Sequence, residues 1–211
     1  MSPVPIDFVV SALVTLVVVV DPVGLAPTYL AVTHGLPEPA RRKVALRATA
    51  IAAAILAGSA LIGLWLLTTL GISLPAFRIA GGLLLFSIAF EMVFGLRIER
   101  QSRAAEQAVE ERAHDIAAFP LAIPLMAGPG AITATLLLAG QAAGRPLMLA
   151  ALIGVIVVVA GTCLTAFLLA DRIGHVLGLT GNIVLSRLLG VLLTALAVQF
   201  VIDGVRAVIA G

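Results

Sequence analysis

The stretch Pro124-Leu-Met-Ala-Gly128-Pro129-Gly130-Ala-Ile-Thr133 lies in the middle of an apolar segment that runs from residue 119 to residue 140. A helix needs about 20 apolar residues to cross the hydrocarbon core of a bilayer. A proline inside a helix removes a backbone hydrogen bond and costs about 3 kcal/mol. Within a membrane, irregular backbone persists only where protein or a water-filled cavity surrounds it. The stretch therefore predicts a broken transmembrane helix beside a cavity.

A second interruption occupies the corresponding place in the first apolar segment, residues 6–33, and reads Asp21-Pro22-Val23-Gly24-Leu-Ala-Pro27. Asp21 before Pro22 is typical of a helix N-cap followed by proline at the first helical position. Gly128 before Pro129 is a weaker version of the same signal. Each restarted helix exposes amide groups with partial positive charge. We expect the two helix starts, after Pro22 and Pro129, to approach each other near the midplane and together to hold an anionic group, for instance the carboxylate of an amino acid.

The composition places the chain in a membrane. It is 61% hydrophobic and only 11% charged, with a mean hydropathy of +1.17, whereas soluble domains carry about 25% charged residues. We expect an all-α polytopic membrane protein with six transmembrane helices, the first and fourth broken at Pro and Gly. The expected spans are residues 6–33, 44–70, 77–95, 119–140, 146–170 and 188–209.

The basic residues predict an orientation, because cytoplasmic loops retain Lys and Arg. With six spans, three of the thirteen basic residues fall on one face: Arg78, Arg145 and Arg206. The other ten share the opposite, cytoplasmic face: Arg41, Arg42, Lys43, Arg47, Arg97, Arg100, Arg103, Arg112, Arg172 and Arg187. Both termini are then predicted outside. The chain has no basic, aromatic-interleaved patch, which argues against a nucleic-acid partner.

An internal repeat relates the third and sixth spans. Arg78-Ile-Ala-Gly81-Gly-Leu-Leu recurs as Arg187-Leu-Leu-Gly190-Val-Leu-Leu, at an offset of 109 residues. The repeat unit contains three spans, and an odd number of spans inverts the second copy. We therefore expect one three-helix repeat at 1–98, a cytoplasmic connector at 99–115 and a second, inverted repeat at 116–211. Inverted repeats are a recurrent plan of secondary transporters.

The residues at and beside the two breaks are the candidate substrate-binding residues: Asp21, Pro22, Gly24, Thr28, Gly128, Pro129, Gly130 and Thr133. A carboxylate at the centre of a bilayer costs at least about 2.5 kcal/mol. Asp21 is either a helix cap or a group that binds a substrate ammonium, a proton or a cation. Glu91 is a second candidate for coupling to protons or sodium, with structural pairing as the alternative. No residue pattern predicts a metal site or a cofactor, and Cys163 is expected to be a small apolar side chain.

The chain resembles the MarC family of bacterial inner-membrane proteins. The matching pieces are Asp21-Pro22-x-Gly24-x-x-Pro27, the run that begins at Arg78, and the block from Pro120 to Thr133. The resemblance implies a relative of the lysine-exporter-like transporters that moves small neutral amino acids or similar zwitterionic metabolites across the bacterial inner membrane. Many family members carry Asn where this chain has Leu25, and a different specificity is expected if that Asn contacts the substrate.

Two further function classes compete with a transporter. An intramembrane enzyme needs a constellation such as a nucleophile with a base, and the three histidines, His34, His114 and His175, lie at or beyond span ends. We therefore predict that the chain is not an enzyme. A non-transporting scaffold or partner protein stays open as an alternative, as does an exporter of drugs or other metabolites.

Overall fold

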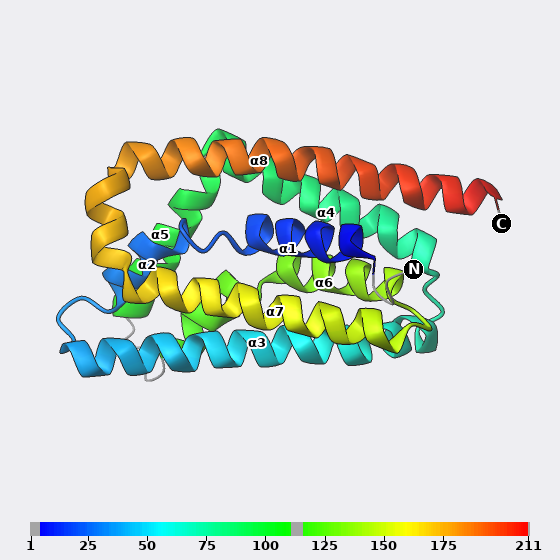
Figure 1. The fold of residues 1–211 in the computed structure, drawn as a ribbon. Coiled ribbons are helices and arrows are strands. Elements are labelled where there is room, and N and C mark those ends of the chain that lie inside the picture. The colour runs from blue at the N-terminus through cyan, green and yellow to red at the C-terminus, as the bar shows by residue number, and fades with distance from the viewer. Residues whose placement is uncertain (1–4, 111–115, 211) are drawn as a thin grey trace.

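The computed structural model describes residues 5–110 and 116–210, and every regular element in these ranges is a helix (Figure 1). This confirms the predicted all-α class. The elements are α1 (Ile6–Val20), α2 (Leu25–Val32), α3 (Glu38–Thr69), α4 (Leu74–Phe94), α5 (Leu96–Glu110), the π-helical η1 (Ala117–Met126), α6 (Pro129–Gln141), α7 (Pro146–Leu168) and α8 (Ala170–Ala210).

Four helical segments are long and apolar enough to cross a membrane: α3, α4, α7 and the part of α8 from Thr180 to Ala210. Two bent pairs raise the number to as many as six. They are α1 with α2, bent by 44°, and η1 with α6, bent by 56°. Both bends lie where the sequence predicts broken helices. Large hydrophobic side chains such as Trp65 and Leu83 are exposed along the bundle, as expected of a surface that faces lipid.

The helices depart from the predicted boundaries at two places. α8 begins at Ala170, well before the expected residue 188, and passes through a kink at Gly178, where φ is 60°. Its first turns carry Asp171, Arg172 and His175, which lower the hydropathy without ending the helix. In the fourth span, Phe119 and Ile123 have extended backbone. A following proline disfavours the α conformation, so the break begins before Gly128.

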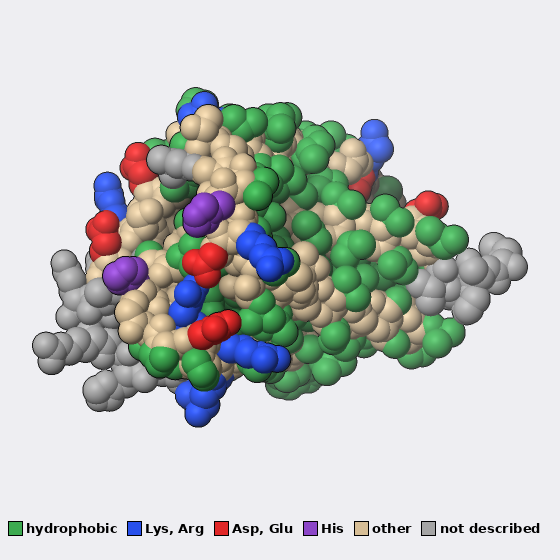
Figure 2. Space-filling view, turned by 60° about the vertical axis from the view of Figure 1, so that its left-hand side comes forward, with side chains coloured by type: hydrophobic (Ala, Val, Ile, Leu, Met, Phe, Trp, Pro, Cys, Tyr) green, Lys and Arg blue, Asp and Glu red, His purple; other side chains and the backbone are tan. Residues whose placement is uncertain are grey.

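The connector predicted at 99–115 falls largely on α5, which starts at Leu96 after Gly95 has turned the chain with a φ of 81°. Residues 111–115 lie outside the described residues. The start of α1 and the end of α8 lie at the same end of the bundle (Figure 1), as an even number of spans requires. At the opposite end, charged and histidine side chains gather on the surface, while hydrophobic side chains cover the flank (Figure 2).

The two helices that carry the sequence repeat, α4 and α8, pack side by side with their chains running in opposite directions (Figure 1). Glycine makes the close approach possible. A Cβ atom at Gly82 would lie 2.7 Å from the carbonyl oxygen of Ala197, and one at Gly190 would lie 2.8 Å from the Cβ of Met92. Small residues at such crossings let helix backbones pack closely in lipid.

We expect Gly82→Ala to lower the thermal unfolding midpoint in detergent micelles, because the added methyl group overpacks the contact of α4 with α8. Overpacking of this kind costs about 1–3 kcal/mol. Gly154→Ala in α7 is the matched control, since a Cβ atom there meets nothing within 4 Å. It should leave the midpoint unchanged or slightly raised, because alanine favours helix over glycine by about 1 kcal/mol. Equal midpoints for both variants would contradict this account of the packing.

Candidate functional site

The first break is a short turn that Asp21 holds in shape. Asp21 ends α1 in the left-handed conformation, with a φ of 57°, and is 2% exposed. The amide of Gly24 donates to Asp21 Oδ1 at 3.0 Å, and the amide of Leu25 donates to the Asp21 carbonyl at 3.1 Å. A Cβ atom at Gly24 would collide with the Asp21 carboxylate. The carboxylate therefore caps the turn, and the turn requires glycine.

The helix restarts later than the sequence predicts. α2 begins at Leu25 with Gly24 as its N-cap, so Pro22 lies in the turn and is not the first helical residue. Asp21 caps the turn that leads into α2 through Gly24. The reason is the left-handed conformation of Asp21, which ends α1 and turns the chain before a new helix can begin. The prediction that Asp21 is the N-cap of the restarted helix is therefore wrong, although its carboxylate does bond to its own chain at Gly24. Its role toward a substrate or an ion stays a prediction.

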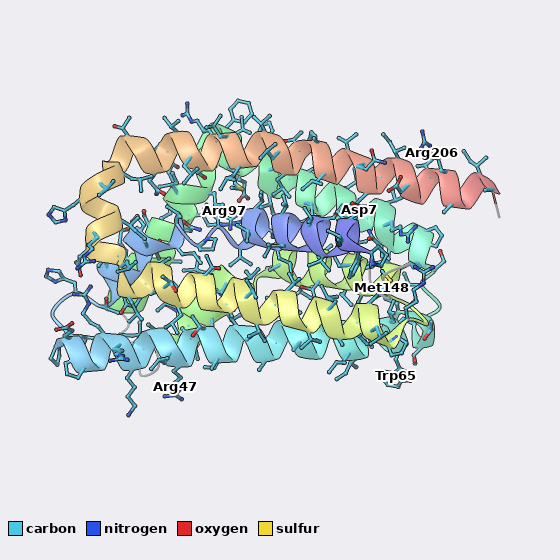
Figure 3. The ribbon with its side chains drawn as sticks, viewed as in Figure 1. Asp7, Arg47, Trp65, Arg97, Met148 and Arg206 are labelled. Atoms are coloured by element: carbon cyan, nitrogen blue, oxygen red, sulfur yellow. The ribbon has the colours of Figure 1, made fainter. Side chains whose placement is uncertain are left out.

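Arg97 closes the other side of the same break. It comes from the first turn of α5, and its side chain points to the gap between α1 and α2 (Figure 3). Arg97 Nη2 donates to the Val19 carbonyl at 2.7 Å and approaches the Val20 carbonyl at 3.5 Å, while Nη1 donates to Met92 Sδ at 3.3 Å. The residue is only 6% exposed. Its guanidinium therefore satisfies carbonyl groups at the negative end of half-helix α1.

Sequence reasoning placed Arg97 at the edge of a solvated connector and missed its burial. Its charge also interacts electrostatically with the buried carboxylate of Asp21. The available signal was Gly95, two residues earlier, which is typical of a helix C-cap. It ends α4, so that α5 starts as a separate helix whose first turn lies at the first break.

The second break follows the prediction closely. α6 begins at Pro129 with Gly128 as its N-cap, and no side chain caps it. Within residues 5–110 and 116–210, no backbone or side-chain acceptor is bonded to the amides of Gly130 and Ala131. A Cβ atom at Gly130 would collide with Ile88 Cδ1 of α4. The start of α6 therefore presents bare amides beside α4.

A cavity of about 310 Å³ lies at this second break, between α4, α5 and the start of α6. Its polar lining residues are Ser87, Glu91, Arg97, Arg100 and Gln101, and its apolar or backbone lining includes Val19, Leu84, Ile88, Pro124, Leu125, Gly128, Pro129, Gly130 and Ala131. Arg100 Nη1 lies 2.9 Å from Glu91 Oε2, so an ion pair stands at the cavity wall.

The cavity brings together part of the predicted site. Gly128, Pro129, Gly130 and Glu91 line it. Asp21, Pro22, Gly24 and Thr28 do not, and the first break reaches the cavity through Val19 and Arg97. Thr133 is not among the lining residues and packs against Gly81 of α4. A Cβ atom at Gly81 would lie 2.7 Å from Thr133 Cγ2.

The two helix N-termini predicted to share one site are thus separated in this structure. The negative end of α1, covered by Arg97, and the positive end of α6 face the cavity. Gly24 and Leu25, at the start of α2, are not among the residues that line the cavity.

Comparisons with known proteins agree on one family. The profile described as MarC family integral membrane protein matches residues 6–209. A UPF0056 membrane protein of Methanocaldococcus jannaschii is 38% identical over 194 residues, which cover 89% of this chain and 91% of that protein. The UPF0056 membrane protein YhcE of Escherichia coli is 34% identical over 192 residues, or 91% of this chain and 89% of the relative. No solved structure matches the chain.

We expect Arg97→Ala to lower the thermal unfolding midpoint of the purified protein strongly, because it leaves the Val19 carbonyl and the Asp21 charge buried without their cation. Removing one partner of a buried charged contact costs about 3 kcal/mol or more. Arg97→Lys keeps the charge and should recover part of the loss. Arg103→Ala, on the exposed face of α5, is the control and should match the wild type. A midpoint for Arg97→Ala equal to that control would exclude a structural role for the guanidinium.

Proposed function

The chain belongs to the MarC family of integral membrane proteins, and on that basis we propose that it is a secondary transporter of small neutral amino acids or similar zwitterionic metabolites. The observation that carries the proposal is the cavity at the second break. It combines bare amides at the start of α6 with a carboxylate and two guanidinium groups, from Glu91, Arg97 and Arg100. A mostly apolar space with a few convergent polar groups is typical of small-molecule sites.

A zwitterion complements this lining at both of its ends. Its carboxylate accepts hydrogen bonds from the amides of Gly130 and Ala131, where the helix dipole of α6 adds positive potential. Its ammonium faces Glu91, which Arg100 holds at the wall. The sequence placed the carboxylate between the helix starts after Pro22 and Pro129. We retain the second of these and replace the first with the cationic end of Arg97, which the geometry favours.

The inverted-repeat plan is part of the proposal. Support comes from reciprocal contacts between α4 and α8, which run antiparallel. A Cβ atom at Gly204 would lie 3.1 Å from the Cβ of Arg78, and one at Gly95 would lie 3.9 Å from Arg187 Nη2. Arg78 thus lies beside Gly204 and Arg187 beside Gly95, which are pairs that the 109-residue offset relates. In such folds, one repeat rocks against the other around a fixed site. The ten-to-three division of basic residues supports an inner-membrane orientation with both termini outside.

The contacts of Arg97 bear on which ion is coupled to transport. In transporters with broken helices, carbonyl groups at half-helix C-termini coordinate the coupling Na⁺. Here the guanidinium of Arg97 bonds to those carbonyls at Val19 and Val20. The Arg97 guanidinium, which belongs to the protein, thus occupies the position that a mobile Na⁺ takes in those transporters. We propose that transport needs no sodium at this position and that Glu91 is the group available for proton coupling.

Uptake into proteoliposomes tests the proposed function. Labelled glycine, alanine and serine should accumulate above the level in empty liposomes, and replacing sodium by choline should leave the rate unchanged. Gly130→Leu forces a side chain against Ile88 at the cavity wall and should reduce uptake by about tenfold or more, since even 1.4 kcal/mol of lost binding is a factor of ten. Glu91→Gln should reduce it as well, because the ammonium loses its counter-charge.

Gly161→Leu in α7 is the control, because a Cβ atom there meets nothing within 4 Å. It should transport like the wild type. No flux of any of the three solutes through a folded, reconstituted protein would reject the amino-acid transporter and leave the scaffold or an exporter of other compounds. Flux that stops without sodium would reject only the account of Arg97.

A further inference from the structure

A second hollow lies at the end of the bundle opposite the chain termini, and it shares no lining residue with the cavity (Figure 1). It has a volume of about 360 Å³ and forms where α2, α3, α7 and α8 meet. Its lining residues are Tyr29, Glu38, Arg41, Arg42, Phe167, Leu168 and Asp171. Neither the breaks nor the proposed transport site uses it.

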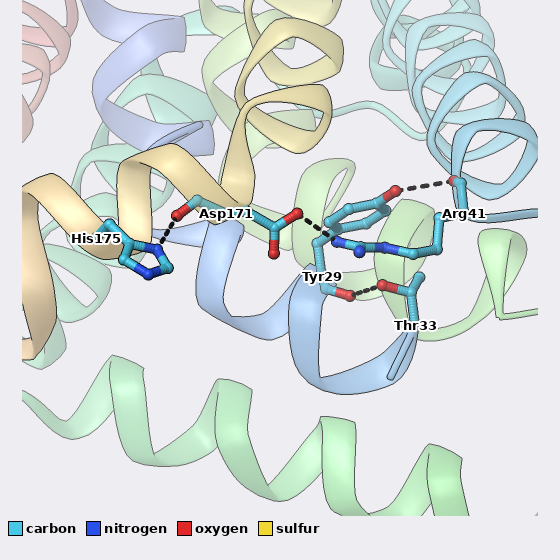
Figure 4. Close-up of polar contacts among 5 residues, drawn as sticks. All are labelled: Tyr29, Thr33, Arg41, Asp171 and His175. Carbon is cyan, nitrogen blue, oxygen red and sulfur yellow. Dashed lines mark hydrogen bonds and ion pairs between the residues drawn. The ribbon is translucent and has the colours of Figure 1, made fainter. Parts of the chain in front are cut away.

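Aromatic and ionic contacts fix the floor of this hollow. The Tyr29 ring stacks on Phe167, with ring centres 4.7 Å apart. The Tyr29 hydroxyl donates to the Arg41 carbonyl at 2.9 Å, and Arg41 Nη2 lies 3.1 Å from Asp171 Oδ2 (Figure 4). Arg41 and Asp171 thus compensate each other, and the hollow is preformed.

Positive charge surrounds this floor in excess. After Arg41 and Asp171 have paired, Glu38 is the acidic residue left in the lining. Arg42 in the lining offsets Glu38, and two further exposed basic residues, Lys43 and Arg172, directly follow the lining residues Arg42 and Asp171 in the sequence. The rim therefore favours an anionic group.

The apolar exterior of the bundle begins directly beside the rim. Leu46 follows Arg42 by one helical turn and is 47% exposed, and Leu168 in the lining is also 47% exposed. Residues at i and i+4 lie on the same face of a helix. A molecule bound at Arg42 with an apolar tail can thus lay that tail along Leu46. This is the arrangement of an amphiphile at a membrane surface, with its charged head above its chain.

We infer that this hollow binds the headgroup of an anionic phospholipid, with its phosphate on Arg42 and Lys43 and its acyl chain against Leu46 and Leu168. Basic pockets between transmembrane helices bind acidic headgroups, and clustered basic residues strengthen the attraction. A free anion such as phosphate has no apolar part that could pack against the exposed leucines. Glu38 opposes the bound charge and therefore limits the affinity. The inference does not depend on transport.

Lipid retention by the full-length protein tests the inference. The purified chain is incubated with equal amounts of phosphatidylglycerol and phosphatidylcholine, and native mass spectrometry counts the bound molecules. We expect several-fold preference for phosphatidylglycerol. Arg42→Gln with Lys43→Gln should reduce that preference by about tenfold, since each basic residue near the surface contributes severalfold in affinity. Glu38→Gln should increase it.

Arg145→Gln with Arg206→Gln is the matched control, because it removes two charges at the other end of the bundle. It should retain phosphatidylglycerol like the wild type. Equal retention of the two lipids by the wild type would overturn the inference, as would an equal loss in the control. Displacement of bound lipid by millimolar glycerol phosphate would also overturn it, because the site would then recognise a soluble phosphate without the acyl chain.

Discussion

The hydrogen bond from the Arg97 guanidinium to the Val19 carbonyl is the contact on which the centre of this protein depends. A helix that stops inside a membrane leaves carbonyl groups without donors, and lipid offers none. Arg97 supplies the donor at 2.7 Å and a positive charge opposite the end of the α1 dipole and the Asp21 carboxylate. The same contact docks α5 beneath the break. The buried side chain of Arg97 thus links the end of α1 to the wall of the cavity.

The two breaks have different roles as a result. At the first, Asp21 and Gly24 close a tight turn, and Arg97 satisfies the carbonyls, so most polar groups already have partners inside the protein. At the second, the amides of Gly130 and Ala131 are bare beside a space of about 310 Å³. Polar groups without internal partners are those that a solute or water must satisfy. The asymmetry explains why the cavity lies at the second break although the sequence marks both.

Much of the fold could be predicted from the sequence, because apolar segments and Pro-Gly interruptions are local signals. The bent pairs α1–α2 and η1–α6 fall where Pro22 and Pro129 predicted them. The position of Arg97 could not be predicted, since it depends on where α5 packs after Gly95, which is a long-range contact. The left-handed conformation of Asp21, after which α2 starts three positions later than predicted, could not be predicted either. Thr133 was predicted to bind the substrate as a polar residue, whereas in the structure its methyl group contacts α4.

A structure of the protein with saturating L-alanine would test the central claim most directly. The account predicts the solute in the cavity, with its carboxylate within hydrogen-bonding distance of the Gly130 and Ala131 amides and its ammonium toward Glu91. Arg97 should still bond to the Val19 carbonyl. A solute bound elsewhere, or a cavity filled by a lipid chain with the amides of α6 unoccupied, would contradict it.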